Sequence, residues 1–122
     1  MTQARLRLGR KGEELAAQKL LARGYEILAR NYRTREGEAD LVARLGAQWV
    51  FVEVRTRRGA HFGTPEESLT PRKRQHLLAA AQAYLAEHNL QDVDWRIDFV
   101  AVELSPRGEL VRIDVIENAV TG

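Results

Sequence analysis

The segment from residue 37 to residue 57, GEADLVARLGAQWVFVEVRTR, constrains the fold of this chain more than any other. It contains two runs rich in apolar and β-branched residues, which predict strands, and Gly46 with Ala47 supplies the centre of a tight turn between them. In such a hairpin the numbers of opposed residues have a constant sum, so Asp40 faces Glu53. The sequence therefore predicts an antiparallel hairpin that sets two carboxylates side by side.

Directly opposed like charges destabilise an antiparallel pair, so something positive must compensate for these carboxylates. The same constant sum pairs Glu38 with Arg55. It also pairs Glu36 with Arg57, and the two-residue period of a strand places Arg55 on the face of Glu53. We therefore expect one sheet face to gather four charged residues: Glu38, Asp40, Glu53 and Arg55.

Two interpretations of this cluster remain open from the hairpin alone. The cluster could be a ladder of ion pairs on a solvated face, where each pair contributes a few tenths of a kcal/mol. Alternatively, it could hold a cation, because the apolar residues 49 to 52 and Val54 indicate that both faces of the second strand are partly buried. Two close carboxylates in a chain without cysteine suit Mg²⁺ or Mn²⁺.

The remaining segments predict the element order αβββαββ within a single domain, since 122 residues supply one hydrophobic core. Thr70 is the expected N-cap of the second helix, with Pro71 as its first residue. The predicted elements are a helix over 11–23, a strand over 25–32, the two hairpin strands, a helix over 71–88, and strands over 94–104 and 109–117.

Glu13 favours the metal-binding interpretation. It shares a helical stripe with Ala17 and Leu20, which predicts that it points toward the sheet. An acidic residue near the start of a helix is also favoured by the helix dipole, and both explanations can hold together.

The charge distribution favours a polyanionic partner, with an ordinary solvated surface as the simpler alternative. Residues 1–61 carry a net charge of +6 and residues 62–122 carry −4. Closely spaced cations bind phosphates through counterion release.

No apolar run approaches the roughly 20 residues that cross a bilayer, and no signal peptide is evident, so we expect a cytoplasmic protein without membrane contact. His61 could approach a metal or phosphate, but a surface role is simpler.

Ordered motifs then cover nearly the whole chain: Gly9, Gly12 and Glu13, then Gly24, Tyr25 and Asn31, then GEADLV, FVEVR, FGTPEE, PRK, RIDFVAV and IENAV. Together they resemble the YraN family of small bacterial proteins, which is related to archaeal Holliday-junction resolvases and similar to PD-(D/E)xK nucleases. The resemblance implies one restriction-endonuclease-like α/β domain over residues 1–122, with a central mixed sheet flanked by helices.

The resemblance also implies a function and a set of site residues. Asp40 and Glu53 would bind one or two Mg²⁺ or Mn²⁺ ions, Glu13 would support them, and Arg55 would complete the catalytic set. The implied activity is hydrolysis of phosphodiester bonds in structured or branched DNA, with a homodimer as an analogy to resolvases. The cations expected to contact DNA phosphates are Arg10, Lys11, Arg57, Arg58 and Lys73.

Arg55 departs from the superfamily, which usually has lysine at that position. A lysine can lose its proton when desolvated, whereas a guanidinium stays charged and cannot act as a base. A catalytically impaired module that only binds nucleic acid is therefore an alternative, and an interaction module with a salt-bridge ladder is a third. Lys73 could supply an amine, although a phosphate-contacting or surface role is simpler.

Overall fold

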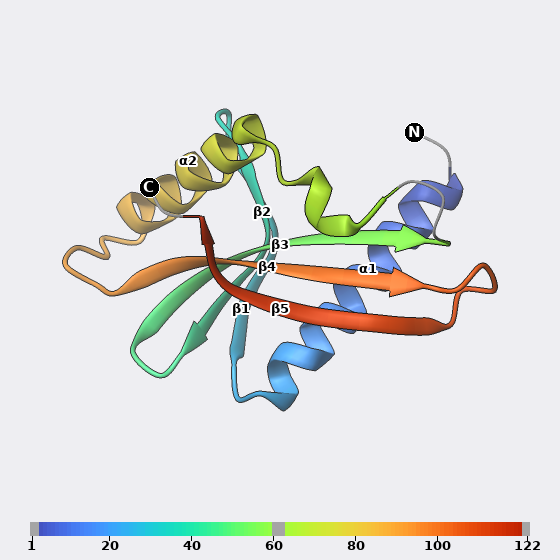
Figure 1. Cartoon of the computed structure of the whole chain (residues 1–122). Helices are drawn as coiled ribbons and strands as arrows, with labels where there is room; N and C mark the ends of the chain where they lie inside the picture. The colour runs from blue at the N-terminus through green and yellow to red at the C-terminus, as the bar shows by residue number, and fades with distance from the viewer. Residues whose placement is uncertain (1–2, 60–62, 121–122) are drawn as a thin grey trace.

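The computed structural model, which describes residues 3–59 and 63–120, is a five-stranded mixed sheet with two α-helices (Figure 1). The elements are α1 (Gln3–Ala22), β1 (Glu26–Arg33), β2 (Glu38–Leu45), β3 (Gln48–Arg58), the short 3₁₀ helix η1 (Pro65–Ser68), α2 (Pro71–Glu87), β4 (Trp95–Leu104) and β5 (Leu110–Val120). The predicted order αβββαββ is confirmed. None of the helices in the described part of the chain is long and apolar enough to cross a membrane.

The strands lie in the sheet in their order along the chain, from β1 to β5. All neighbours are antiparallel except β3 and β4, which are parallel and are joined by the crossover that contains η1 and α2. The ladder between β2 and β3 runs from Leu45 opposite Gln48 to Leu41 opposite Val52, so the predicted hairpin register is confirmed. Gly46 at the turn has a φ of 61°, which glycine adopts without strain.

The two helices cover opposite faces of the sheet, and Figure 1 shows them on its two sides. The α1 stripe of Ala16, Ala17 and Leu20 is fully buried against one face. On β3 the alternation sends Val52 toward α1 and Phe51 toward α2. Both faces of the hairpin are therefore buried, as the sequence predicted.

Most element boundaries lie within one residue of the prediction, but one end of α1 and one end of β5 differ by several residues. The helix α1 begins at Gln3 rather than near residue 11, because the low helix propensity of Gly9 and Gly12 does not interrupt it. The strand β5 continues to Val120, since a register shift between β4 and β5 accommodates the positive φ of Asn118. Both elements are longer than the sequence pattern indicated.

A buried polar network at Asp98 joins the end of α1 to β4 and β5. The side chain of Asp98 is fully buried, and its Oδ2 accepts hydrogen bonds from the Tyr25 hydroxyl at 3.1 Å and from Arg96 at 3.2 Å. Its Oδ1 accepts from the backbone N–H of Asn118 at 2.9 Å, at the shift in register. This network gives the RIDFVAV and IENAV motifs a structural role.

Candidate functional site

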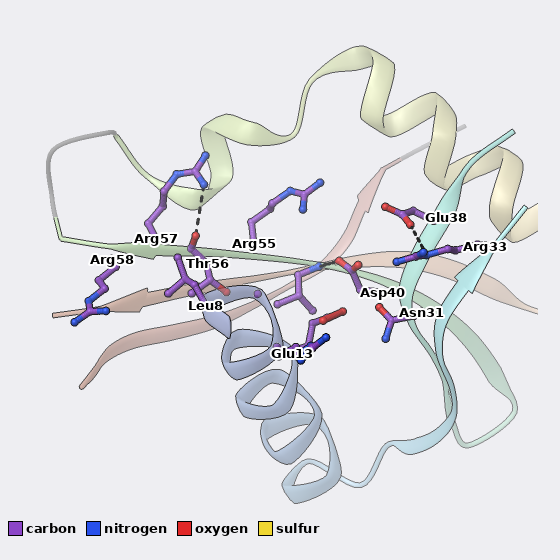
Figure 2. Close-up of a pocket in the computed structure, with 13 residues that line it drawn as sticks. Leu8, Glu13, Asn31, Arg33, Glu38, Asp40, Arg55, Thr56, Arg57 and Arg58 are labelled. Atoms are coloured by element: carbon purple, nitrogen blue, oxygen red, sulfur yellow. Dashed lines mark hydrogen bonds and ion pairs between the residues drawn. The ribbon is translucent and has the colours of Figure 1, made fainter. Parts of the chain in front are cut away.

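A cleft of about 920 Å³ opens between α1 and the strands β1, β2 and β3 (Figure 2). Several of the residues predicted for the site lie in its wall: Arg10, Glu13, Asp40, Arg55, Arg57 and Arg58. Glu38 of the predicted charged cluster lies in the wall as well, together with Arg33 and the uncharged Asn31. The cleft thus joins three carboxylates with a larger number of guanidinium groups.

Asp40 lies where β2 separates from β3. The ladder between these strands ends at Leu41 opposite Val52, while β2 stays paired with β1 through Ala39. Beyond that point the Oδ2 of Asp40 accepts a hydrogen bond from the backbone N–H of Val54 at 2.7 Å. A side-chain carboxylate therefore satisfies a β3 donor that the departing strand leaves without a backbone partner.

Asp40 and Glu53, predicted to be directly opposed, lie beyond the last pair of the ladder, although their carboxyl groups are in hydrogen-bond contact. The separation also makes two further predicted cross-strand pairs wrong. Glu38 lies opposite Arg33 of β1, and the Arg33 Nε is 3.2 Å from its Oε2, so Glu38 does not pair with Arg55. Glu36 lies in the turn before β2 rather than opposite Arg57. The constant sum fails here because it assumes that the ladder continues to the ends of both strands.

Glu53 is only 5% exposed and lies next to Asp40. Burial raises the pKa of Glu53 to about 9, with further contributions from a hydrogen bond to the Asp40 carboxyl group and from its charge. The positive charges of Arg55 and Lys73 act in the opposite direction. Because the cations do not outweigh these effects, the metal-free pair of carboxyl groups retains a proton at neutral pH.

Arg55 is the cation in contact with this pair. Its Nη2 lies 3.2 Å from the Oε2 of Glu53, and 29% of its side chain is exposed. The Nε of Arg55 and the Nε of Arg57 are both buried and find no hydrogen-bond partner among the described residues. Figure 2 shows both side chains extending from β3 toward the side of η1 and α2. Buried donors without partners are rare in proteins, so these two favour an anionic ligand.

Glu13 lies on α1, and Figure 2 shows it directed toward Asp40. Burial raises its pKa, and the charges of Asp40 and Glu38 raise it further. The close approach of the helix depends on Gly12, since a Cβ atom there would lie 1.7 Å from the Oγ1 of Thr56 on β3. A glycine on the helix thus allows the neighbouring acid to reach the cleft.

The donor set suits a hydrated divalent cation. Among residues 3–59 and 63–120, no three His, Asp or Glu side chains are arranged so that they could hold a metal ion by themselves. The pair of Asp40 and Glu53 remains, and Glu13 is directed toward Asp40 from α1. Mg²⁺ commonly keeps several waters and binds through one or two carboxylates together with substrate phosphates. A pair of carboxylates therefore suits Mg²⁺ better than it suits a metal that is enclosed by protein ligands.

Of the other predicted cations, Lys11 and Arg58 are hydrogen-bonded to the protein, whereas Arg10 is exposed. Lys11 and Arg58 bond to the turn between β4 and β5: the Lys11 Nζ donates to the Gly108 carbonyl, and the Arg58 Nε donates to the Pro106 carbonyl at 2.9 Å. Arg10 is exposed in the cleft wall. His61 lies outside the described residues.

Lys73 approaches the carboxylate pair from the first turn of α2, on the other side of the sheet from α1. Its burial lowers its pKa, as do the charges of Arg55 and Arg57, whereas Glu53 and Asp40 act to raise it. The cations whose charges act on Glu53 therefore come from two elements, β3 and α2.

Sequence reasoning did not assign a role to Asn31 and Arg33, which line the cleft from β1. Asn31 has a φ of 53°, an unusual conformation for a residue within a strand. In the sequence, Asn31 is marked only by its place among the ordered motifs, because a positive φ cannot be predicted from an isolated asparagine.

Comparison with known proteins identifies the family. A model of the Uncharacterised protein family UPF0102 matches residues 12–102. A UPF0102 protein of Roseiflexus castenholzii is 50% identical over 121 residues, which is 98% of each chain. Another from Dehalococcoides mccartyi is 47% identical over 115 residues, 92% of this chain and 95% of the relative. One from Acidothermus cellulolyticus is 57% identical over 91 residues, 75% and 69% of the two chains. The chain therefore belongs to the UPF0102 family, the YraN family that its motifs indicated.

Proposed function

We propose that this protein is a metal-dependent endonuclease that hydrolyses phosphodiester bonds in structured or branched DNA. The observation that carries this proposal is the pairing of the buried Glu53 with the half-buried Asp40, beside a basic cleft in which two guanidinium Nε donors lack partners among the described residues. A salt-bridge ladder belongs on a solvated face, whereas Glu53 is buried. Its ion pair with Arg55 therefore does not make this site an ordinary surface ladder.

In this proposal Asp40 and Glu53 hold one or two Mg²⁺ or Mn²⁺ ions, and Glu13 supports them from α1. The bound cation would polarise the phosphate and lower the pKa of a bound water. The N–H of Val54 fixes one oxygen of Asp40, which keeps this carboxylate oriented toward the site. Arg55 orients Glu53 through Nη2 and retains its Nε for a phosphate oxygen.

The proposed reaction is a simple displacement. The oxygen of a water molecule forms a bond to phosphorus while one phosphorus–oxygen ester bond breaks, which leaves a phosphate monoester and a hydroxyl group. Negative charge develops on the phosphate oxygens, and the guanidinium groups of Arg55 and Arg57 would stabilise it. Since these groups address the phosphate backbone, we expect selection by DNA shape rather than by base sequence.

The topology supports a restriction-endonuclease-like domain. The hairpin of β2 and β3, the crossover through α2 and the parallel strand β4 follow the αβββαβ order that such nucleases share. We include a cytoplasmic location and a homodimer on symmetric branched DNA in the proposal. Light scattering with and without a four-way junction tests the homodimer, since a two-to-one complex is expected on the junction.

A second candidate function is DNA binding without efficient cleavage. Arg55 favours this function. It occupies the position where the superfamily usually has lysine, its guanidinium cannot lose its proton, and it is already in contact with Glu53. Under this alternative the cleft binds metal and DNA, but the phosphodiester bond stays intact.

The test is cleavage of labelled single-stranded, duplex, flapped and four-way DNA in Mg²⁺ or Mn²⁺. We expect metal-dependent cleavage by the wild type, loss of cleavage in Asp40→Ala, and normal cleavage in the control Glu26→Gln, which removes an exposed carboxylate paired with Arg44 on the sheet edge. Intact substrates that are nevertheless bound would favour the second candidate. If Asp40→Ala cuts as well as the wild type, the assigned site is wrong.

A further inference from the structure

We propose that Asn31 is a third protein ligand of the metal site, and that its side-chain oxygen binds the divalent cation held by Asp40 and Glu53. The inference rests on the proposed function and deepens it. It assigns a role to β1, the edge strand that pairs with β2.

The first argument is the position of Asn31 in the ladder between β1 and β2. This ladder pairs Arg30 with Leu41 and continues to the end of β1 without a further shift in register. Asn31 therefore lies directly opposite Asp40. Directly opposed residues of an antiparallel pair have Cβ atoms about 4.5 to 5.5 Å apart, which places the amide group beside the carboxylate.

The second argument is that the amide group is available to a ligand. Asn31 is exposed, and it lines the cleft together with Asp40. Figure 2 shows its side chain close to those of Asp40 and Glu13. A cation bound to Asp40 in the cleft would therefore find an amide oxygen among its neighbours.

The third argument is the backbone of Asn31. Its φ is 53°, although the ladder on both sides of it is regular. Other residues with a similar φ have evident structural reasons: Asn89 and Asp92 lie between α2 and β4, and Asn118 lies at a register shift of β5. Neither a loop nor a register shift accounts for Asn31. Unusual backbone conformations of this kind cluster at functional sites.

The fourth argument is the chemistry of a neutral oxygen donor. Carbonyl oxygens suit Mg²⁺ and Mn²⁺ as carboxylates do, but they add no negative charge. Four acidic residues already lie in or beside the site: Glu13, Glu38, Asp40 and Glu53. A neutral third ligand completes the donor set with less repulsion in the metal-free protein than a further carboxylate would cause.

A different role for Asn31 would be a hydrogen bond from its amide NH₂ group to a DNA phosphate. Two substitutions separate the roles. Asn31→Gly removes the whole amide group, and glycine adopts a positive φ without strain. Asn31→Asp keeps a side-chain oxygen but removes the donor, and aspartate also tolerates a positive φ. Only the ligand role predicts that these changes affect metal binding in the absence of DNA.

The first experiment is Mn²⁺ calorimetry without DNA on the wild type, Asn31→Gly and Asn31→Asp. The matched control is Asn89→Gly, which changes an exposed asparagine with a φ of 54° after α2. We expect the affinity for Mn²⁺ to fall about 10- to 100-fold in Asn31→Gly and to stay at or above the wild-type value in Asn31→Asp. Asn89→Gly should bind as the wild type does.

Two results would overturn the inference. One is unchanged affinity for Mn²⁺ in Asn31→Gly, which would leave the phosphate contact as the role of this residue. The other is an equal loss of affinity in Asn31→Gly and Asn31→Asp, because the second variant retains the oxygen. Thermal unfolding of the metal-free variants confirms that both are folded.

A second measurement has a spectroscopic readout. The chain contains no cysteine, so Asn31→Cys introduces a single thiol. Thiolates prefer soft metals, and a thiolate at a ligand position should bind Cd²⁺ with a new thiolate-to-metal absorption band. The band should disappear when Asp40→Ala is added, and Asn89→Cys should not give it at the same Cd²⁺ concentration. A folded Asn31→Cys protein without this band would contradict the ligand role.

The outcomes separate this inference from the function on which it rests. If the wild type binds Mn²⁺ through Asp40 and Asn31→Gly binds it equally well, the proposed metal site stands and the role of Asn31 is wrong. If the wild type shows no saturable Mn²⁺ binding, the metal site of the proposed function fails and the ligand role of Asn31 fails with it.

Discussion

Glu53 is a buried acid with too little positive charge around it. Its side chain contacts Arg55, yet burial and the neighbouring Asp40 still raise its pKa to about 9. A group with a raised folded-state pKa stabilises the protein fully below its unfolded-state pKa and loses that contribution as the pH rises toward the folded value. The metal-free protein should therefore become less stable between pH 5 and pH 9.

The first prediction concerns Glu53→Gln in the absence of metal. The stability of the wild type should fall by roughly 1 kcal/mol per pH unit over this range, whereas Glu53→Gln should remove most of that slope. Urea unfolding at several pH values measures both curves. A wild-type slope that persists unchanged in Glu53→Gln would show that another group titrates instead.

Asp98 is a second buried acid, but its partners satisfy it. Asp98→Ala removes the carboxylate that accepts from the Tyr25 hydroxyl, from Arg96 and from the backbone N–H of Asn118, and it leaves the guanidinium of Arg96 without its buried counter-charge. We expect a loss of about 3 to 5 kcal/mol in unfolding free energy, because one partner of a buried charged network is removed.

Asp114→Ala is the control for Asp98. Asp114 pairs with Arg112 on the surface, where 55% of its side chain is exposed. Its loss should cost less than about 1 kcal/mol in the same urea unfolding experiment. Equal effects of the two substitutions would contradict the structural role given to Asp98.

Among the elements, α1 depends on a close approach to β3. Gly12→Ala should improve helix propensity by about 1 kcal/mol, yet the added Cβ would collide with the Oγ1 and the Cβ of Thr56. We expect the collision to dominate, with a net loss of about 1 to 3 kcal/mol and weaker metal binding as Glu13 moves. Thermal unfolding and a metal titration measure the two effects.

Gly9→Ala is the matched substitution on the same helix. A Cβ at Gly9 meets no atom within 4 Å, so this change should stabilise the protein by up to about 1 kcal/mol. The opposite signs of the two substitutions test the packing of α1. Stabilisation by Gly12→Ala as well would mean that the helix does not lie this close to β3.

The elements also show how far sequence reasoning reaches. The register of the hairpin followed from the turn at Gly46, because a two-residue turn fixes every opposed pair while the ladder lasts. The end of the ladder at Leu41 did not follow, since it depends on the pairing of β2 with β1 and on the Asp40 side chain. The predicted partner of Glu38 was wrong for this reason.

The whole molecule places charges that are distant in the sequence on one site. The basic cleft uses residues of α1 and the first three strands, which explains the positive charge of the first half of the chain. The positive charge of Lys73 on α2 also acts on Glu53. The sequence could predict the residue types of the site, whereas the approach from two sides of the sheet needed the tertiary structure, because the crossover sets where α2 begins.

The proposal depends first on a divalent ion binding at Asp40 and Glu53, and Mn²⁺ calorimetry of the metal-free protein tests this most directly. Titration at pH 7.5 in two buffers with different ionisation enthalpies should show saturable binding with release of about one proton, because the raised pKa of Glu53 leaves the carboxyl pair protonated. Asp40→Ala should lose this binding, and Glu26→Gln should retain it. Absence of saturable binding in the wild type, or unchanged binding in Asp40→Ala, would contradict the assignment of this site.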